Sequence, residues 1–455
     1  MQRVLWTLPA TQLATGAAAV RDSALERAAE PGLIGQPVFP IEHELLGSLS
    51  ADTDAVVELS SYRHAFVTSD RERADLLAEL AATGASDVEI QTRPANAVRL
   101  IPPRRSPTVV SLTTDFGTTP DLTGHQQYLA DAPHGIGVGA GWSRPGGTGA
   151  ADGVARAIRI VDVETGWNPR HEDLRGRVRG PITGYDEDVP DHGTAVLGVL
   201  AASNNRFGTI GIVPDAELYV AGVYYAEGSD GTPQWNTEAA IIEALRVLGG
   251  GDVLVLELHA PHPGALPPDP YQCGFVAVEY WSACHAAVAQ AVSRGVYVVA
   301  AAGNGAMDLD DPVLGGRFSA ARDPGSILVG AGGSGLGDVP AGARHSFSNY
   351  GRRVTLQGWG DAVATTGGLS EGLYHDLYHG GTAERCYTAS FGGTSSATPI
   401  VAGVVAMTSS LLRAAGRPPL APRQMRSLLE KTSRGAGEGI GGTPDVEAII
   451  KELGL

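Results

Sequence analysis

The stretch Phe391-Gly-Gly-Thr-Ser-Ser-Ala-Thr-Pro399 decides how this chain is interpreted, because it places Ser395 in a short Gly-Thr turn directly before a long apolar segment. The apolar spacing over residues 396–414 predicts a helix that begins beside this serine. A serine hydroxyl is a weak nucleophile at neutral pH. It carries chemistry only when a base, a group that orients the base and donors for an oxyanion are also present. The sequence offers a candidate for each of these roles.

Each of these candidates lies where a predicted element begins or ends. His192, in Asp191-His-Gly-Thr-Ala-Val-Leu-Gly198, opens an apolar stretch and is the candidate base. Asp162 follows the apolar run over residues 157–161 and is the candidate orienting carboxylate. Asn304 follows the apolar run over residues 296–302 and is the candidate oxyanion donor. Because sites in open parallel sheets form at the carboxyl ends of the strands, these placements predict a single catalytic site.

The chain order Asp, His, Ser is that of subtilisin, and the chain resembles the subtilisin-like serine peptidases (subtilases). The segments Gly211-Ile-Val-Pro-Asp-Ala-Glu-Leu-Tyr219, Ile327-Leu-Val-Gly-Ala331 and His345-Ser-Phe-Ser-Asn-Tyr-Gly351 also look like segments of that family. The likeness covers about residues 149–433. Several family-like motifs in the family's order are far more specific than any one alone.

The resemblance implies a three-layer α/β fold with a mostly parallel central sheet, which the alternation of predicted strands and helices also favours. It implies a serine endopeptidase that works through Asp162, His192 and Ser395 and an acyl-enzyme intermediate, with Asn304 at the oxyanion. A catalytically idle protein that has kept the fold for binding or scaffolding is the alternative. Because all four chemical groups are present, the active enzyme is favoured.

One departure from the family pattern lies beside the candidate carboxylate. A subtilase usually has a glycine two positions after its triad aspartate, whereas here Glu164 fills that position and Gly166 comes later. Glu164 is expected either to raise the basicity of His192 or to face solvent. Of these two alternatives we favour solvent.

The other departure concerns the strand that lines the substrate groove. Where the family has Ser-Leu-Gly, this chain has Leu256-Glu-Leu-His-Ala260. The family's glycine lets a substrate backbone lie close, so the bulk of His259 is expected to narrow the groove and restrict cleavage. The candidate substrate-binding residues are therefore Glu257, Leu258, His259, Ala302 and Gly303. An insertion over residues 261–280 is expected at the rim of the cleft.

Three parts of the chain differ in pattern. Residues 1–105 are predicted to form a small α/β N-terminal domain, with strands over residues 55–59, 64–68, 87–91 and 97–101 and a helix over residues 71–82. It resembles the propeptide of subtilases in position and pattern, and a retained accessory domain is an equal alternative. Residues 106–150 are rich in Pro, Gly and Thr and are predicted to be a linker or wrap. Residues 151–455 are predicted to be the catalytic domain.

Composition limits the partners of the protein. The net charge of -17 argues against nucleic acid or anionic lipid as a partner, and no run of eighteen apolar residues occurs, so no membrane span is expected. A protein or peptide substrate remains as the expected partner, and the sequence does not indicate an oligomeric state.

The first ten residues make a poor signal peptide, so a cytoplasmic or non-classically secreted protein is expected. Because many subtilases are secreted, an extracellular location is the alternative.

No cofactor is expected. Calcium is common in subtilases, but no EF-hand-like run of ligands occurs, so a structural calcium ion is left unassigned. The three cysteines, Cys273, Cys284 and Cys386, are an odd number, and free thiols are favoured over a bridge between the first two.

Overall fold

The computed structural model describes residues 2–7, 36–37, 62–67, 69–83, 85–96, 118–150, 156–185, 191–227, 233–263, 272–370 and 374–455. Its largest element is a nine-stranded sheet with the strand order β20-β21-β16-β15-β14-β11-β6-β8-β7. All neighbouring strands are parallel except β20 and β21. The strands are β6 (Arg159–Glu164), β7 (Val178–Arg179), β8 (Glu217–Gly222), β11 (Val253–Leu256), β14 (Tyr297–Ala301), β15 (Ile327–Gly332), β16 (Val354–Trp359), β20 (Arg434–Gly437) and β21 (Gly441–Thr443).

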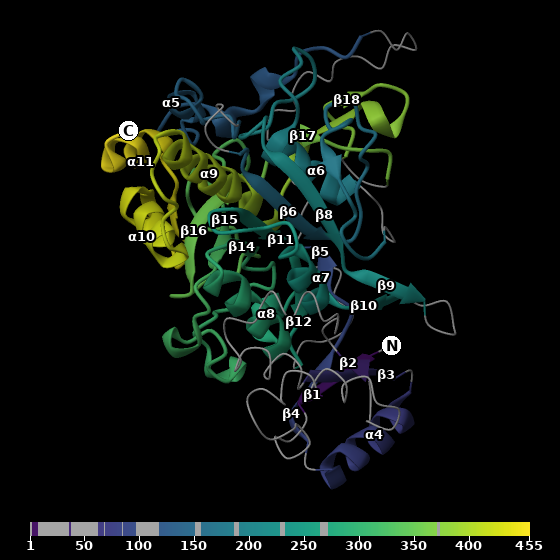
Figure 1. The fold of residues 1–455 in the computed structure, drawn as a ribbon. Helices are drawn as coiled ribbons and strands as arrows, with labels where there is room; N and C mark the ends of the chain where they lie inside the picture. The colour runs from purple at the N-terminus through teal and green to yellow at the C-terminus, as the bar shows by residue number, and fades with distance from the viewer. Residues whose placement is uncertain are drawn as a thin grey trace.

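Helices cover both faces of this sheet (Figure 1). One layer holds α5 (Val138–Trp142), α6 (Asp191–Ala201), α9 (Thr394–Ala414), α10 (Pro422–Thr432) and α11 (Val446–Leu453), and the other holds α7 (Thr237–Ala244) and α8 (Ser282–Ser293). The side chains of β6 alternate between the two layers: Ile160 packs with the first, and Val161 and Val163 pack with the second. The expected three-layer α/β fold is confirmed.

Short strands surround the sheet. β9 (Tyr224–Glu227) pairs with β10 (Pro233–Trp235), and β17 (Val363–Thr366) and β18 (Tyr378–His379) both pair with β19 (Cys386–Phe391). β12 (Leu258–Pro261) pairs antiparallel with β13 (Phe275–Ala277). The apolar spacing over residues 276–294 indicates a single helix, but α8 begins only at Ser282. Pairing with β12 and a 3-10 turn, Val278–Tyr280, take up the residues before it.

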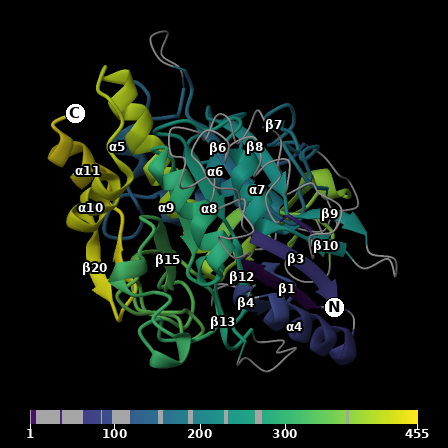
Figure 2. The ribbon, with the colours of Figure 1, turned by 60° about the horizontal axis from the view of Figure 1, so that its bottom comes forward.

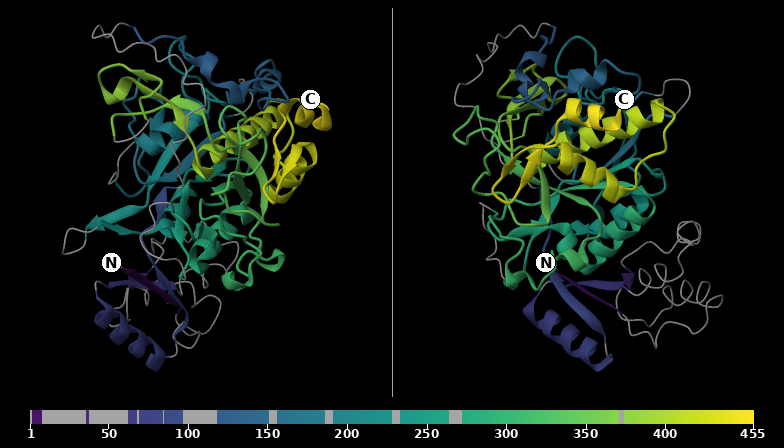
Figure 3. Two further views of the ribbon diagram at one scale, coloured as in Figure 1. Left: turned by 180° about the vertical axis from the view of Figure 1, so that it is seen from behind. Right: turned by 90° about the vertical axis from the view of Figure 1, so that its left-hand side faces the viewer.

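The N-terminal residues form a separate small unit, which lies at one end of the molecule in Figure 3. Its antiparallel sheet has the order β2-β3-β1-β4, with β1 (Gln2–Thr7), β2 (Gln36–Pro37), β3 (Tyr62–Val67) and β4 (Ser86–Gln91). Along β1, Val4 and Trp6 pack in the cluster beneath α4 (Asp70–Thr83), and Leu5 packs toward the large domain. The strands expected at residues 64–68 and 87–91 and the helix at 71–82 are present. Those at 55–59 and 97–101 lie outside the described residues.

This unit lies beside α7 and α8 (Figure 2), and polar contacts join it to them. Arg3 forms a buried ion pair of 2.8 Å with Glu238 in the first turn of α7. Glu89 accepts hydrogen bonds from the backbone N–H and the hydroxyl of Ser282, where α8 begins. A carboxylate at a helix N-terminus is favoured by the helix dipole. The unit is therefore held by charge as well as by apolar packing.

In the part of the chain that the structure describes, α9 is the one helix long and apolar enough to cross a membrane, and it is wholly buried inside the protein. Residues 118–150, which include α5, pack against the layer that holds α9. Trp142 there donates a hydrogen bond of 2.9 Å to the carbonyl of Ile212.

Candidate active site

The sheet brings the predicted catalytic groups to one edge. Asp162 lies near the carboxyl end of β6, and Asn304 follows the carboxyl end of β14. His192 is the second residue of α6, and Ser395 is the second residue of α9. All four side chains are buried. The strands and helices thus bring these four residues to the same edge of the sheet.

The carboxylate that contacts the imidazole belongs to Glu164. Its Oε2 atom lies 2.5 Å from Nδ1 of His192. Its Oε1 atom accepts hydrogen bonds from the backbone N–H of Thr165 at 2.8 Å and from the Thr165 hydroxyl at 3.2 Å. Glu164 is fully buried, so the expectation that it faces solvent is wrong. Glu164 is therefore the carboxylate that the structure places against the His192 ring.

Asp162 does not contact His192, which corrects its predicted place. Its Oδ2 atom accepts a hydrogen bond of 2.9 Å from Nε1 of Trp167, and its Oδ1 atom has no partner among the described residues. Burial, and after it the charge of Glu164, raises the pKa of Asp162 well above its usual range. Residues two apart on a strand point the same way, but only Glu164, at the last position of β6, reaches the start of α6.

A signal for Glu164 was present in the sequence. Gly166 stands two positions after Glu164, which is the spacing that subtilases show after their triad carboxylate. Aligning the motif on this glycine would have selected Glu164 over Asp162.

Ser395 lies at the N-terminus of α9, where Gly393 adopts a φ of 90° that side chains disfavour. Its hydroxyl donates a hydrogen bond of 3.3 Å to the carbonyl of Glu257. Nε2 of His192 has no hydrogen-bond partner within the described residues. The serine and the base are therefore not hydrogen-bonded in this state. Catalytic hydrogen bonds are often long or unmade before substrate binds, and the serine hydroxyl turns about a single bond.

Asn304 is held from several sides. Its Oδ1 atom accepts hydrogen bonds of 3.0 Å from both the backbone N–H and the hydroxyl of Thr394, one residue before Ser395. Its Nδ2 atom donates to Oε1 of Gln272 at 3.1 Å. A fixed orientation of this kind suits a side-chain amide that donates a hydrogen bond to an oxyanion, because the N–H group must point at the oxygen before its negative charge develops.

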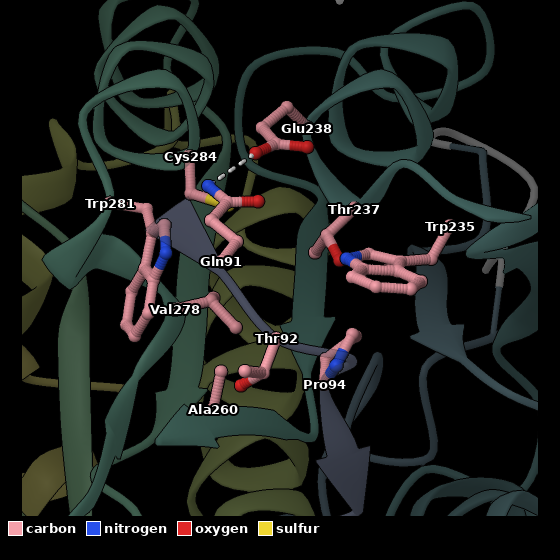
Figure 4. Close-up of a pocket in the computed structure, with 10 residues that line it drawn as sticks. All are labelled: Gln91, Thr92, Pro94, Trp235, Thr237, Glu238, Ala260, Val278, Trp281 and Cys284. Atoms are coloured by element: carbon pink, nitrogen blue, oxygen red, sulfur yellow. Dashed lines mark hydrogen bonds between the residues drawn. The ribbon is translucent and has the colours of Figure 1, made fainter. Parts of the chain in front are cut away.

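The N-terminal unit pairs with the predicted substrate strand. β5 (Ala95–Asn96) runs antiparallel to β12, with Asn96 opposite Leu258 and Ala95 opposite His259. An extended segment of the chain thus lies along the edge to which a substrate strand would be added. Beside it, between the two units, lies a small cavity of about 20 Å³, whose lining residues are drawn in Figure 4. Its lining comes from Gln91, Thr92, Pro94, Trp235, Thr237, Glu238, Ala260, Val278, Trp281 and Cys284.

The other candidate substrate-binding residues face the interior. The carbonyl of Ala302 accepts a hydrogen bond of 2.6 Å from Nδ2 of Asn349, and the carbonyl of Gly303 accepts one of 3.0 Å from the Asn349 N–H. His259 is fully buried and accepts a hydrogen bond from the N–H of Asn304 at 3.1 Å. Its ring therefore points at the oxyanion donor, not into the groove as expected.

Glu257 is also fully buried, and neither of its carboxyl oxygens has a hydrogen-bond donor in the described part of the chain. Burial raises the pKa of its carboxyl well above the usual range, and the charges of Asp162 and Glu164 raise it further. The Ser395 hydroxyl acts in the opposite direction. Burial and the neighbouring acids therefore favour the neutral form of the Glu257 carboxyl.

The structure offers little to a metal ion. Across the described ranges, no three His, Cys, Asp or Glu side chains gather as a metal site would require. None of Cys273, Cys284 and Cys386 is in a disulfide bond, so no bridge joins Cys273 to Cys284; Cys273 is exposed, and the other two are buried.

Comparisons with known proteins point to one family. The model of the subtilase family matches residues 156–445. M-protease of Shouchella clausii (strain KSM-K16) is 29% identical over 427 residues, which cover 91% of this chain and 89% of that protein. Subtilisin Savinase of Lederbergia lenta is 31% identical over 288 residues, 62% of this chain and 84% of the relative.

A solved structure extends the likeness of the fold. Fervidolysin from Fervidobacterium pennivorans, described as a keratinolytic enzyme related to subtilisin, superposes with a TM-score of 0.57 at 19% identity. The match covers 99% of this chain and 60% of that one. From the matched family and its protease relatives, the chain belongs to the subtilase family of serine-type endopeptidases.

Proposed function

We propose that the protein cleaves peptide bonds with Ser395 as nucleophile, His192 as general base and Glu164 as the carboxylate that orients the base. The observation that carries this proposal is the 2.5 Å contact between Glu164 and Nδ1 of His192. With Nδ1 committed to the carboxylate, Nε2 is the nitrogen free to accept a proton. A glutamate in place of the aspartate is chemically equivalent in this role.

In this mechanism, Nε2 of His192 takes the proton of the Ser395 hydroxyl as its oxygen attacks the peptide carbonyl. The imidazolium that forms lies beside the Glu164 carboxylate, which stabilises it. The oxyanion accepts hydrogen bonds from the Asn304 side-chain amide and from the Ser395 N–H at the start of α9. His192 then gives the proton to the leaving amine, and water hydrolyses the acyl-enzyme by the same steps in reverse.

We also propose that the N-terminal unit restrains this activity. β5 occupies the edge of β12, and an extended substrate would have to take the same edge. Departure of the unit would open that edge and the adjoining cavity, whose lining includes Trp235, Val278 and Trp281. The apolar part of that lining supports a preference for an apolar side chain upstream of the cleaved bond, and hence restricted specificity.

The test uses the full chain and its Ser395→Ala variant. A fluorophosphonate probe should label the wild type and leave the variant unlabelled. N-terminal sequencing after storage should find a shortened wild type beside a full-length variant. Labelling of neither protein would favour the alternative, an idle subtilase fold used for binding. Labelling without shortening would keep the peptidase and reject removal of the N-terminal unit.

A further inference from the structure

Asn304, the proposed oxyanion donor, is held by the hairpin that β12 and β13 form. His259, on β12, accepts the hydrogen bond from the Asn304 backbone N–H through its Nδ1 atom at 3.1 Å. Gln272, three residues before β13, accepts the hydrogen bond from Asn304 Nδ2 at 3.1 Å. Thr394 donates two hydrogen bonds to the remaining polar atom of the side chain, Oδ1. Among the described residues, the hairpin therefore supplies two of the four hydrogen bonds to Asn304.

The hairpin is pressed against the loop that carries Asn304. A Cβ atom on Gly305 would lie 2.5 Å from the backbone nitrogen of Phe275, so only glycine fits there. The Gly305 carbonyl accepts a hydrogen bond of 2.9 Å from the N–H of Gly274. The His259 ring packs on that of Phe275, with 4.7 Å between ring centroids. Close packing of this kind makes the hairpin and the loop move together.

The backbone at Gln272 is unusual. Its φ of 57° lies in the left-handed region, which a long unbranched side chain rarely adopts. Such conformations persist where the surrounding structure imposes them, often at functional sites. Here that conformation accompanies the hydrogen bond between the Gln272 side chain and Asn304.

We infer that His259 and Gln272 are positioning residues that hold Asn304 in the orientation in which it donates to the oxyanion. This inference rests on the proposed function, in which Asn304 is that donor. The amide carries two N–H hydrogens, and Gln272 binds one, which leaves the other for the substrate. An oxyanion donor is effective because it needs no reorganisation during the reaction. Its position must stay within about 0.5 Å of the productive geometry.

The contact also defines the state of His259. Because Nδ1 accepts a hydrogen bond from an N–H group, the proton of the neutral ring is on Nε2. Asparagine can place its side-chain oxygen at the position of Nδ1 and would keep the hydrogen bond. Phenylalanine has a ring without nitrogen and would lose it.

The test compares His259→Asn with His259→Phe in the full chain, with steady-state kinetics on one peptide substrate. His259→Phe should lower kcat by roughly tenfold to a hundredfold with little change in KM. That is less than the hundredfold to thousandfold loss typical when the donor itself is removed. His259→Asn should retain most of the wild-type kcat. Gln272→Met keeps the length of the side chain but cannot accept the hydrogen bond from Asn304, so it should behave like His259→Phe. It provides the same test if His259→Phe fails to fold.

A double-mutant cycle separates positioning from a general effect on the fold. In an Asn304→Ala background the amide is absent, so His259→Phe should cause no further loss of kcat. The same fractional loss in both backgrounds would overturn the inference, and so would full activity of His259→Phe and Gln272→Met. Activity that survives in Ser395→Ala would instead contradict the proposed function, so the two failures are distinguishable.

Discussion

Oε2 of Glu164 lies 2.5 Å from Nδ1 of His192, while the carboxylate of Asp162, two residues earlier on the same strand, is bonded to Trp167. The two acids therefore differ in function although they share one face of β6. Glu164 pairs with the base, and Asp162 lies behind it, where burial favours its neutral form. A neutral acid there avoids placing a second buried charge next to the pair.

The packing at Gly193 predicts that this pair is sensitive to one added methyl group. A Cβ atom there would lie 2.7 Å from Cγ of Glu164 and 2.7 Å from Cδ1 of Trp167. Gly193→Ala should displace the carboxylate, with a loss of stability of about 1–3 kcal/mol, typical of overpacking, and a larger fractional loss of kcat. Urea unfolding and peptide hydrolysis measure the two effects. Gly124→Ala, where a Cβ meets nothing within 4 Å, is the control. Wild-type kcat in Gly193→Ala would contradict the packing argument.

The buried acid Glu257 predicts a dependence of stability on pH. Because its pKa is raised in the folded protein, the folded state keeps a proton that the unfolded state has lost. The stability that this proton provides is present below the ordinary value of 4.5 and is lost as the pH rises toward the raised value. The loss is about 1.4 kcal/mol per pH unit for one proton.

Glu257→Gln removes this titration. In a Ser395→Ala background, which prevents self-cleavage, the melting temperature of the Glu257→Gln variant should rise relative to its parent as the pH increases above 4.5. Glu447→Gln, on the exposed side of α11, should show no such divergence. Parallel melting curves for Glu257→Gln and its parent would show that Glu257 does not bind a proton in the folded state.

The ion pair between Arg3 and Glu238 predicts how firmly the N-terminal unit is held. Both side chains are buried, so Arg3→Met would leave the Glu238 charge unpaired, at a cost of about 3–5 kcal/mol. Hydrogen exchange in β1 and β4 should accelerate while exchange in β14 stays slow. The double variant Arg3→Met/Glu238→Gln should recover part of the lost stability, because the unpaired charge of Glu238 is removed. Unchanged exchange in Arg3→Met would show that apolar packing alone holds the unit.

The fold could be predicted largely from local pattern. Two strands can be placed to within a few residues from the apolar runs that precede Asp162 and Asn304, and one helix from the long apolar stretch after Ser395. Such assignments succeed because the spacing of apolar residues and the identity of turn residues are local properties of the sequence. Residues 276–281 are an exception. Val276 and Ala277 pair with β12, and Val278–Tyr280 form a 3-10 turn, so the helix begins later than the local pattern indicates. Tertiary pairing overrides local preference there.

The site could be predicted only in part. Strand periodicity places Asp162 and Glu164 on one face but does not say which one meets His192, since that depends on where α6 packs. In the same way, the bulk of His259 was visible in the sequence, but its direction was not. Its contact with Asn304 depends on a hairpin whose second strand begins at Phe275.

The proposed role of Glu164, rather than Asp162, in orienting His192 is tested by kcat/KM for peptide hydrolysis by Glu164→Gln and Asp162→Asn, measured beside the wild type. Loss of the orienting carboxylate should lower the rate by about ten thousandfold, as in other serine peptidases. We expect a loss of that size for Glu164→Gln and a far smaller one for Asp162→Asn. A large loss in Asp162→Asn beside a small one in Glu164→Gln would show that Asp162 orients the base instead.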